Sequence, residues 1–133
     1  MFDYISICKE NPIGVLATIN GEKIKTRMFL FLFAEGKKAY FSTSEKKPVC
    51  KQLNENPSVS FCTHSKNFEP VISLNGKAVF VEDPKLKVRA LEESPLIKEI
   101  FKTPGNPDLK LFYIDIEEIE TFLSNEGIKN YLL

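Results

Sequence analysis

The sequence predicts a mainly β fold with a few short helices, in which about six antiparallel strands form a barrel or a strongly curved sheet. Segments rich in β-forming residues recur along the chain, and tight turn sequences such as Asn20-Gly21 join most of them. At 133 residues and 15.2 kDa the chain has the size of one domain, and we expect residues 1–133 to form it.

The first part of the chain is expected to form a helix and three strands. Phe2, Ile5 and Cys8 recur at helical spacing until the sequence ENP ends the pattern. The strands expected next are IGVLATI (13–19), IKTRMFLFLF (24–33) and AYFST (39–43), joined by the turns NGEK and AEGKK. Consecutive strands joined by turns this short pair antiparallel, so these three form a meander.

A short helix is expected over 48–56, because proline suits its first position and Val49 and Leu53 lie four residues apart. Ser42 and Glu45 would fit a capping box that starts the helix earlier. We prefer the later start, because the earlier one would place the proline inside the helix, where it removes a hydrogen bond.

The remaining segments leave three alternatives open. SVSFCTH (58–64) alternates as a strand does, whereas 70–83 is either a hairpin at Asn75-Gly76 or one long strand bent at the glycine. Asp83-Pro84 starts one broken helix or two short helices, and LKLFYIDI (109–116) is the closing strand. The tail EEIETFLSNEGIKNYLL could be strand, helix or both.

The segment 24–33 carries apolar side chains on both of its faces. Beyond Arg27, one face holds phenylalanines at every second position, and the other holds Met28, Leu30 and Leu32. A small barrel has one interior, so the outward set needs cover from a helix, a ligand or a second subunit. This is the first indication of a homodimer.

Charge and cysteine usage argue against several environments. The 18 basic and 18 acidic residues give zero net charge, so we expect no nucleic acid and no membrane as partners. No run approaches the ~20 apolar residues that span a bilayer, and the N-terminus does not resemble a signal peptide. The three cysteines form no C-x-x-C pair, and a reducing compartment suits them. We therefore expect an unprocessed, cytoplasmic protein.

Several common catalytic motifs are absent. The sequence contains no G-x-G-x-x-G after a strand, no P-loop, no G-x-S-x-G and no H-E-x-x-H, so Rossmann, nucleotide-hydrolysing and metallopeptidase chemistry are unsupported. His64 is the single histidine and lies at a strand end, where a hydrogen-bonded structural role is expected. No metal site is expected.

The segment YFSTSEKKPVCKQL combines the groups that hold a phosphate. Hydroxyl donors at Ser42 and Thr43 end a strand, and a helix N-terminus follows with Lys46, Lys47 and Lys51 around it. On a helix the last two lysines share one face, away from the apolar pair. The alternative is that these lysines only form the solvated helix face.

Arg27 makes an anion site more plausible. It is the only arginine in the first 88 residues and lies in a strand that is almost wholly apolar from there to Phe33. An unpaired charge would be costly in such a place. Its partner is either a carboxylate, such as Glu22, Glu35 or Glu45, or the phosphate that the lysine segment would contact.

The segments PIGVLATINGEKIKTRMFLFLF, AYFSTSEKKPVCKQLNENPSVSF and NGKAVFVED, with LFYIDI as a last strand, together resemble a known family. They are similar to the pyridoxamine 5′-phosphate oxidase-like FMN-binding split barrels, and most similar to the small general-stress and nitroimidazole-reductase-like branch. The resemblance implies a six-stranded antiparallel split β-barrel that forms a homodimer, with one FMN per subunit at the interface.

The resemblance also implies roles for individual residues. Arg27 and the backbone of Met28, Phe29 and Leu30 would meet the flavin and its phosphate tail. Ser42 and Thr43 would approach ribityl or phosphate oxygens, Lys47 and Lys51 would meet the phosphate, and Gln52 would be a polar contact nearby. Lys46 could take the place of Lys47, because the spacing before this helix varies in the family.

One departure bears on the activity. Pyridoxamine phosphate oxidases carry a C-terminal Arg-x-His element for the substrate phosphate, whereas the tail here is SNEGIKNYLL, so vitamin B6 oxidation is not expected. Some relatives bind a deazaflavin or haem instead of FMN, and only His64 could ligate haem iron.

The leading hypothesis is an FMN-dependent oxidoreductase that reduces a small acceptor, such as a nitroaromatic or a quinone. The alternative is a non-catalytic flavin-binding or redox-sensing protein. A third hypothesis, a cofactor-free barrel that binds oligonucleotides, is disfavoured by the zero net charge.

Overall fold

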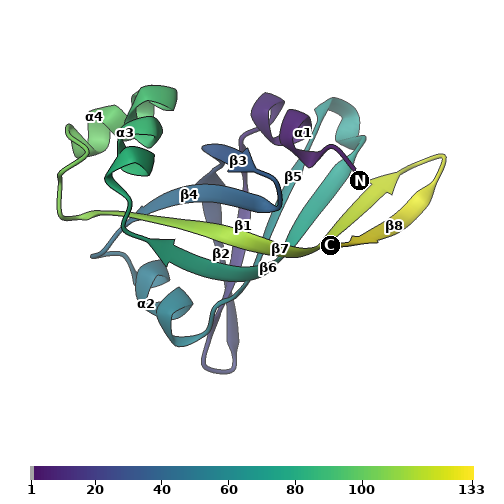
Figure 1. The fold of residues 1–133 in the computed structure, drawn as a ribbon. Coiled ribbons are helices and arrows are strands. Elements are labelled where there is room, and N and C mark those ends of the chain that lie inside the picture. Colours follow the sequence, from purple (N-terminus) through teal and green to yellow (C-terminus); the bar gives the residue numbers. More distant parts are fainter. Residues whose placement is uncertain (1) are drawn as a thin grey trace.

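One antiparallel sheet runs through the protein, whose structure is a computed structural model that describes residues 2–133 (Figure 1). The strands lie in the order β2-β1-β5-β6-β7-β4-β3, and β8 pairs with β7. The ends of this path, β2 and β3, are not paired with each other, so the curved sheet is a split barrel and not a closed one. The strands are β1 (Ile13–Asn20), β2 (Lys23–Leu30), β3 (Phe33–Glu35), β4 (Lys38–Ser44), β5 (Ser58–His64), β6 (Val71–Val81), β7 (Leu109–Leu123) and β8 (Gly127–Leu132).

Short helices connect the strands, as the sequence predicted. They are α1 (Tyr4–Glu10), α2 (Pro48–Glu55), α3 (Pro84–Glu93) and α4 (Pro95–Phe101), with the 3-10 turn η1 (Lys66–Phe68). In the region after Asp83 the chain forms two short helices and not one broken helix.

Figure 1 shows α3 and α4 together at one end of the sheet, and α1 beside β3 and β5. The predicted fold class, mainly β with short helices in an antiparallel split barrel, is confirmed, with eight strands where about six were expected.

The single strand expected over 24–33 is in fact two strands, β2 and β3. The chain changes partners at Phe31, whose N–H donates to the Pro12 carbonyl (2.7 Å), and at Leu32, whose N–H donates to the Tyr40 carbonyl (3.0 Å). β2 pairs with β1, whereas β3 pairs with β4. The chain therefore passes from one half of the sheet to the other at this point.

Two hydrophobic clusters form the core, and β7 contributes to both. The larger cluster lies between the curved sheet, α1 and α2, and includes Phe112 and Ile114 of β7. The smaller one lies beneath α3 and α4 and includes Leu109 and Leu111. Because β7 also pairs with both β4 and β6, it joins the two halves of the sheet.

The alternatives left open at Asn75-Gly76 and in the tail are settled as one long strand and as strands, respectively. The segment at Asn75-Gly76 is one long strand, β6, with a bulge in its pairing to β7 at this point and no hairpin turn. A Cβ atom at Gly76 would collide with the Asp115 carbonyl of the neighbouring strand, which explains the glycine. The first part of the tail extends β7, and after a turn the chain runs antiparallel to it as β8. Among the described residues, no helix is long and apolar enough to cross a membrane.

Candidate functional site

Arg27 lies half-buried on β2, where it donates hydrogen bonds only to neutral acceptors. Its Nη1 donates to Thr18 Oγ1 (2.8 Å) and its Nη2 to Gln52 Oε1 (2.7 Å), and longer contacts reach the carbonyls of Leu16 and Lys25 (3.3 Å each). Burial lowers the pKa of the guanidinium, because the charged form loses hydration. Among residues 2–133, the acceptors of these hydrogen bonds are all neutral, so none of them neutralises the positive charge.

The carboxylate partner considered for Arg27 is not found. Within residues 2–133 no carboxylate forms an ion pair with it. Glu35, one of the candidates, instead pairs with Arg89 at 2.7 Å.

Gln52 is held in place by α2 and by Thr18. The helix buries one face through Val49, Cys50 and Leu53, and Gln52 lies on that buried side. Its amide oxygen accepts from the hydroxyl of Thr18 (2.7 Å) as well as from the arginine. Both polar side chains are buried, so this network fixes the orientation of the guanidinium.

A small cavity lies where β4 ends and α2 begins. Ser42, Thr43, Ser44 and Lys47 line one side of it, and residues of α4 with Asp108 line the other. Its volume is about 160 Å³, enough for a phosphate group but below the ~300 Å³ at which drug-sized pockets begin. The cavity can therefore receive one end of a nucleotide and not the whole molecule.

Thr43 borders this cavity, but its side chain lies on the face of β4 that carries Ala39 and Phe41, opposite Ser42 and Ser44. The residue is 4% exposed, yet its Oγ1 has no hydrogen-bond partner among the described residues. Such a group costs roughly 1–3 kcal/mol when it stays unpaired. The neighbouring Ser44 hydroxyl, by contrast, donates to the Asp108 carboxylate (2.7 Å). Of the predicted pair of hydroxyls, Thr43 is therefore buried without a partner among the described residues, whereas Ser42 is half-buried.

The N-terminus of α2 opens beside the same cavity. No side chain caps its first turn, whereas Asp3, Asp83 and Ser94 cap the other three α-helices of residues 2–133. Lys46 and Lys47 are exposed there, and neither forms an ion pair in the described chain.

Lys51 differs from the other two lysines of this segment. Its side chain is 81% exposed and lies 3.9 Å from Glu55, one turn further along α2. As predicted, it lies on the helix face away from the buried Val49 and Leu53. The structure thus brings Ser42, Thr43 and Lys47 together, and places Lys51 on the solvated side.

The three residues after Arg27 divide between the two faces of β2. Phe29 points inward, with its ring 6.2 Å from that of Phe41 and 6.0 Å from that of Phe112. Met28 points outward, is 63% exposed and faces Val15 on β1. Four outward apolar residues near this end of the two strands, Ile13, Val15, Met28 and Leu30, are here called the β1–β2 outer face.

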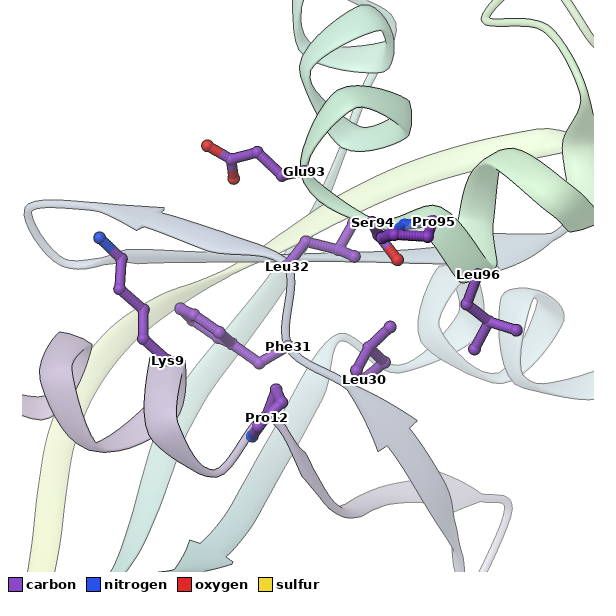
Figure 2. A pocket seen from close by; sticks show the side chains of 9 residues that line it. All are labelled: Lys9, Pro12, Leu30, Phe31, Leu32, Glu93, Ser94, Pro95 and Leu96. Carbon is purple, nitrogen blue, oxygen red and sulfur yellow. The ribbon is translucent and has the colours of Figure 1, made fainter.

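A second, larger cavity of about 540 Å³ begins at Leu30. Figure 2 shows that it lies between the end of α1, the chain that links β2 to β3, and the junction of α3 with α4. This cavity was not predicted, because its walls come from segments far apart in the sequence.

Sequence reasoning also missed Thr18, Asp108 and Ser94. For Thr18 a signal existed, because in IGVLATI it falls on the same alternating face as Leu16 and so predicts a hydroxyl on the buried side. Asp108 and Ser94 carried no such pattern, since each lies in a connecting segment.

The site can bind an anion, but it has little acid–base chemistry of its own. His64 lies elsewhere, exposed at the end of β5, with its ring stacked on Phe68 at 4.3 Å. No group of three His, Cys, Asp or Glu side chains within residues 2–133 could hold a metal ion. Burial raises the pKa of the Cys8 thiol to about 12, so this cysteine is unreactive near neutral pH.

Comparison with protein families and solved structures gives a consistent picture. A family model described as pyridoxamine 5′-phosphate oxidase matches residues 5–123. No curated protein sequence matches the chain.

Three solved structures illustrate the shared fold. A NimC/NimA family protein from Clostridium acetobutylicum has a TM-score of 0.87 at 23% identity, covering 98% of this chain and 90% of that one. General Stress Protein 26 from Bacillus anthracis has a TM-score of 0.81 at 23% identity, covering 96% and 94%. A heme binding protein from Mycobacterium smegmatis has a TM-score of 0.78 at 15% identity, covering 95% of this chain and 55% of that one.

Proposed function

The chain belongs to the pyridoxamine 5′-phosphate oxidase family, and from this membership we propose that it binds FMN and uses the flavin to reduce a small acceptor. The observation that carries the proposal is Arg27, a half-buried cation whose hydrogen-bond acceptors are all neutral. An anion from outside the chain would neutralise it, and a phosphate monoester carries about two negative charges near pH 7.

The unpaired hydroxyl of Thr43 tests whether a phosphate fits here. A buried hydroxyl without a partner would gain a hydrogen bond if a ligand brought an acceptor to it. The small cavity at the end of β4 has room for a phosphate group, and Ser42, Lys47 and the uncapped start of α2 adjoin it. Asp108 lies at the same cavity, so the lysine charge is needed to offset its repulsion. We infer that the residues present fit a phosphate.

In this proposal the predicted residues keep distinct roles. Arg27, Lys47 and the Thr43 hydroxyl hold the phosphate, and Lys46 adds positive charge nearby. Ser42 meets ribityl oxygens, while Gln52 keeps the guanidinium oriented through its 2.7 Å contact. Lys51 contributes at long range, because it is exposed and lies beside Glu55. The backbone of residues 28–30 flanks the flavin ring.

The bound flavin would supply the electron or hydride transfer, and the protein supplies binding, orientation and exclusion of water. The apolar side chains around Leu30 favour a planar, weakly polar acceptor such as a nitroaromatic compound or a quinone. No side chain near Arg27 is required to act as a general acid.

We also propose that the protein is a homodimer with the flavin near the subunit interface. The β1–β2 outer face supports this, because it presents four apolar residues in two directly opposed pairs, Ile13 with Leu30 and Val15 with Met28. An exposed apolar sheet face of this kind commonly marks an interface. Phe29 is engaged in the core and cannot serve this purpose.

Titration with FMN and with riboflavin tests the proposal, since the two ligands differ by the phosphate alone. FMN should bind roughly 100-fold more tightly or better, as two charge-assisted contacts of about 1.5 kcal/mol each would give. Flavin fluorescence and absorbance measure both affinities. Equal affinities would show that the phosphate contacts are wrongly assigned. Turnover of a nitroaromatic acceptor with a reduced nicotinamide donor then separates an oxidoreductase from a flavin-binding protein without catalysis.

A further inference from the structure

Two opposite charges line the small cavity at the end of β4 without pairing with each other. Lys47 stands on one side and Asp108 on the other, and no ion pair joins them within residues 2–133. The carboxylate is half-buried, and no lysine or arginine of the described chain pairs with it. A charge in such a place is unfavourable unless another group compensates it. A phosphate in this cavity would repel Asp108 further, so the residue needs a reason of its own.

The Asp108 carboxylate is held in a fixed orientation. Its Oδ2 accepts from the Ser44 hydroxyl (2.7 Å), and its backbone N–H donates to Asn106 Oδ1 (2.9 Å). Asn106 is fixed in turn, because its amide nitrogen donates to the Phe101 carbonyl at the end of α4 (3.0 Å). The second carboxylate oxygen, Oδ1, accepts no hydrogen bond from the described residues. Asp108 therefore offers a ligand in this cavity one oriented acceptor.

The backbone of the turn before α2 offers a ligand few donors. The Lys46 N–H donates to the Ser44 hydroxyl (3.2 Å), and the Lys47 N–H donates to the Ser44 carbonyl (3.0 Å). Both N–H groups are therefore used within the protein. What remains for a ligand is the ammonium group of Lys47 and the hydroxyl of Ser42, which have no partner in the part of the chain described, and the free oxygen of Asp108.

A ligand that satisfies both sides of the cavity carries a negative group and, close to it, a hydrogen-bond donor. The negative group meets Lys47, and the donor meets Asp108. A hydroxyl suits this position better than an ammonium group, because Lys46 and Lys47 already supply positive charge at this end of α2. A hydroxyl that donates to a carboxylate forms one of the stronger hydrogen bonds in proteins. Ile100 and Phe101 add an apolar wall for the carbon atoms between the two groups.

We propose that Asp108 is a specificity-determining residue, which accepts a hydrogen bond from a hydroxyl on the carbon next to the one that bears the ligand's phosphate. The cavity then selects phosphate esters of polyols. It rejects simple alkyl phosphates, because these leave the carboxylate unpaired beside an anion. In FMN the hydroxyl concerned is the one at C4′ of the ribityl chain. That FMN supplies it rests on the proposed function, whereas the preference for a hydroxyl beside the phosphate does not.

Glycerol 3-phosphate and n-propyl phosphate test this preference on the whole protein without added flavin. Both are three-carbon monophosphates, but only glycerol 3-phosphate has a hydroxyl on the carbon next to the phosphate-bearing one. Two-dimensional ¹H–¹⁵N NMR gives both affinities from the shifts of residues 42–47 and 106–108, which surround the cavity. Glycerol 3-phosphate should bind about tenfold more tightly, as one hydrogen bond to a charged group gives. Equal affinities would overturn the proposal, as would tighter binding of O-phosphoethanolamine, in which an ammonium group replaces the hydroxyl.

Asp108→Asn separates a hydrogen bond to the ligand from simple repulsion, because the amide keeps the shape and can still accept from Ser44. It should tighten binding of n-propyl phosphate and not of glycerol 3-phosphate, so the tenfold preference should fall to about threefold or less. Glu92→Gln, which changes a carboxylate at a different cavity, is the matched control and should keep the preference. If both phosphates gained affinity equally, Asp108 would only repel anions. If both lost affinity together with thermal stability, its role would be structural. Either result would contradict the assignment, and the comparison in the unaltered protein decides if the variant does not fold.

FMN titration distinguishes this inference from the proposed function. An analogue whose flavin carries an unsubstituted 5-phosphopentyl chain should bind about tenfold more weakly than FMN, or weaker still, and Asp108→Asn should reduce that difference. If FMN bound more tightly than riboflavin while the two small phosphates bound equally, the inference would fail and the proposed function would stand. If FMN did not bind while glycerol 3-phosphate kept its advantage, the proposed function would fail and the role of Asp108 would stand.

Discussion

At the scale of single residues, Arg27 shows how a charge can be kept half-buried without a carboxylate. Thr18 and Gln52 provide oxygen dipoles that stabilise the guanidinium, but neither neutralises it. A neutral partner stabilises a cation less than an anion does, so the residue retains affinity for an anion.

Arg27→Ala should lower FMN affinity by about one to two decades while changing stability little. The fold should tolerate the change because Thr18 still donates to Gln52 when the guanidinium is gone. Flavin titration and thermal unfolding measure the two quantities. Lys25→Ala, two residues earlier on the same strand and exposed, is the control and should bind FMN normally. Normal binding by Arg27→Ala would show that the arginine is structural.

Thr43→Val should have opposite effects on stability and on binding. Valine has nearly the same shape and suits a strand, and it removes a buried hydroxyl that has no partner among the described residues. The free protein should therefore be as stable as before or more stable, by up to about 1 kcal/mol. FMN affinity should fall several-fold. Loss of stability in urea unfolding would reveal that the hydroxyl has a partner within the fold.

Part of this site could be predicted from the residue types alone. An arginine alone in an apolar strand and a cluster of hydroxyls and lysines after another strand both indicate an anion site, and the structure places Ser42, Thr43 and Lys47 at one cavity. The neutral partners of Arg27 could not be predicted, because Thr18 and Gln52 are 34 positions apart and meet only through tertiary packing.

At the scale of elements, α2 separates lysines that look equivalent in the sequence. Lys47 precedes its first turn and lines the cavity, whereas Lys51 points away from it toward Glu55. Lys47→Ala should weaken FMN binding about fivefold or more, and Lys51→Ala by less than about twofold, because an exposed charge contributes little. Titrations of the two variants at equal ionic strength provide the comparison. A larger effect at Lys51 would place the phosphate on the other side of the helix.

The local sequence pattern predicts where strands and helices occur. It is less able to predict where one strand ends and the chain begins to pair with a different strand. The strand 58–64 was predicted with its exact bounds, because its alternation and flanking turns lie within a few residues. The break at Phe31 was not predicted, since the run 24–33 is continuous in its β-forming residues. What interrupts it is a hydrogen bond from Leu32 to Tyr40, on a strand reached only after the next turn.

At the scale of the whole molecule, the proposed dimer can be tested with two matched substitutions. Met28 and Ile128 are 63% and 66% exposed, but only Met28 belongs to the β1–β2 outer face. Met28→Glu should lower dimer stability and FMN affinity together, because a charge buried at an interface is unfavourable. Ile128→Glu, on β8, should change neither. Light scattering and flavin titration would decide, and a folded Met28→Glu monomer with unchanged flavin affinity would exclude an interface there.

The position of β7 in the sheet has a consequence for how the protein is made. Without residues 109–123, β4 would pair only with β3, and β6 only with β5, so the sheet would fall into two pieces with unfinished hydrophobic clusters. A ribosome delivers this strand after both β4 and β6, at about 5–20 residues per second. For those seconds the nascent chain exposes two unpaired strand edges that could recruit chaperones or aggregate. A chain stalled before Leu109 should remain sensitive to protease, and one released after Leu123 should become resistant.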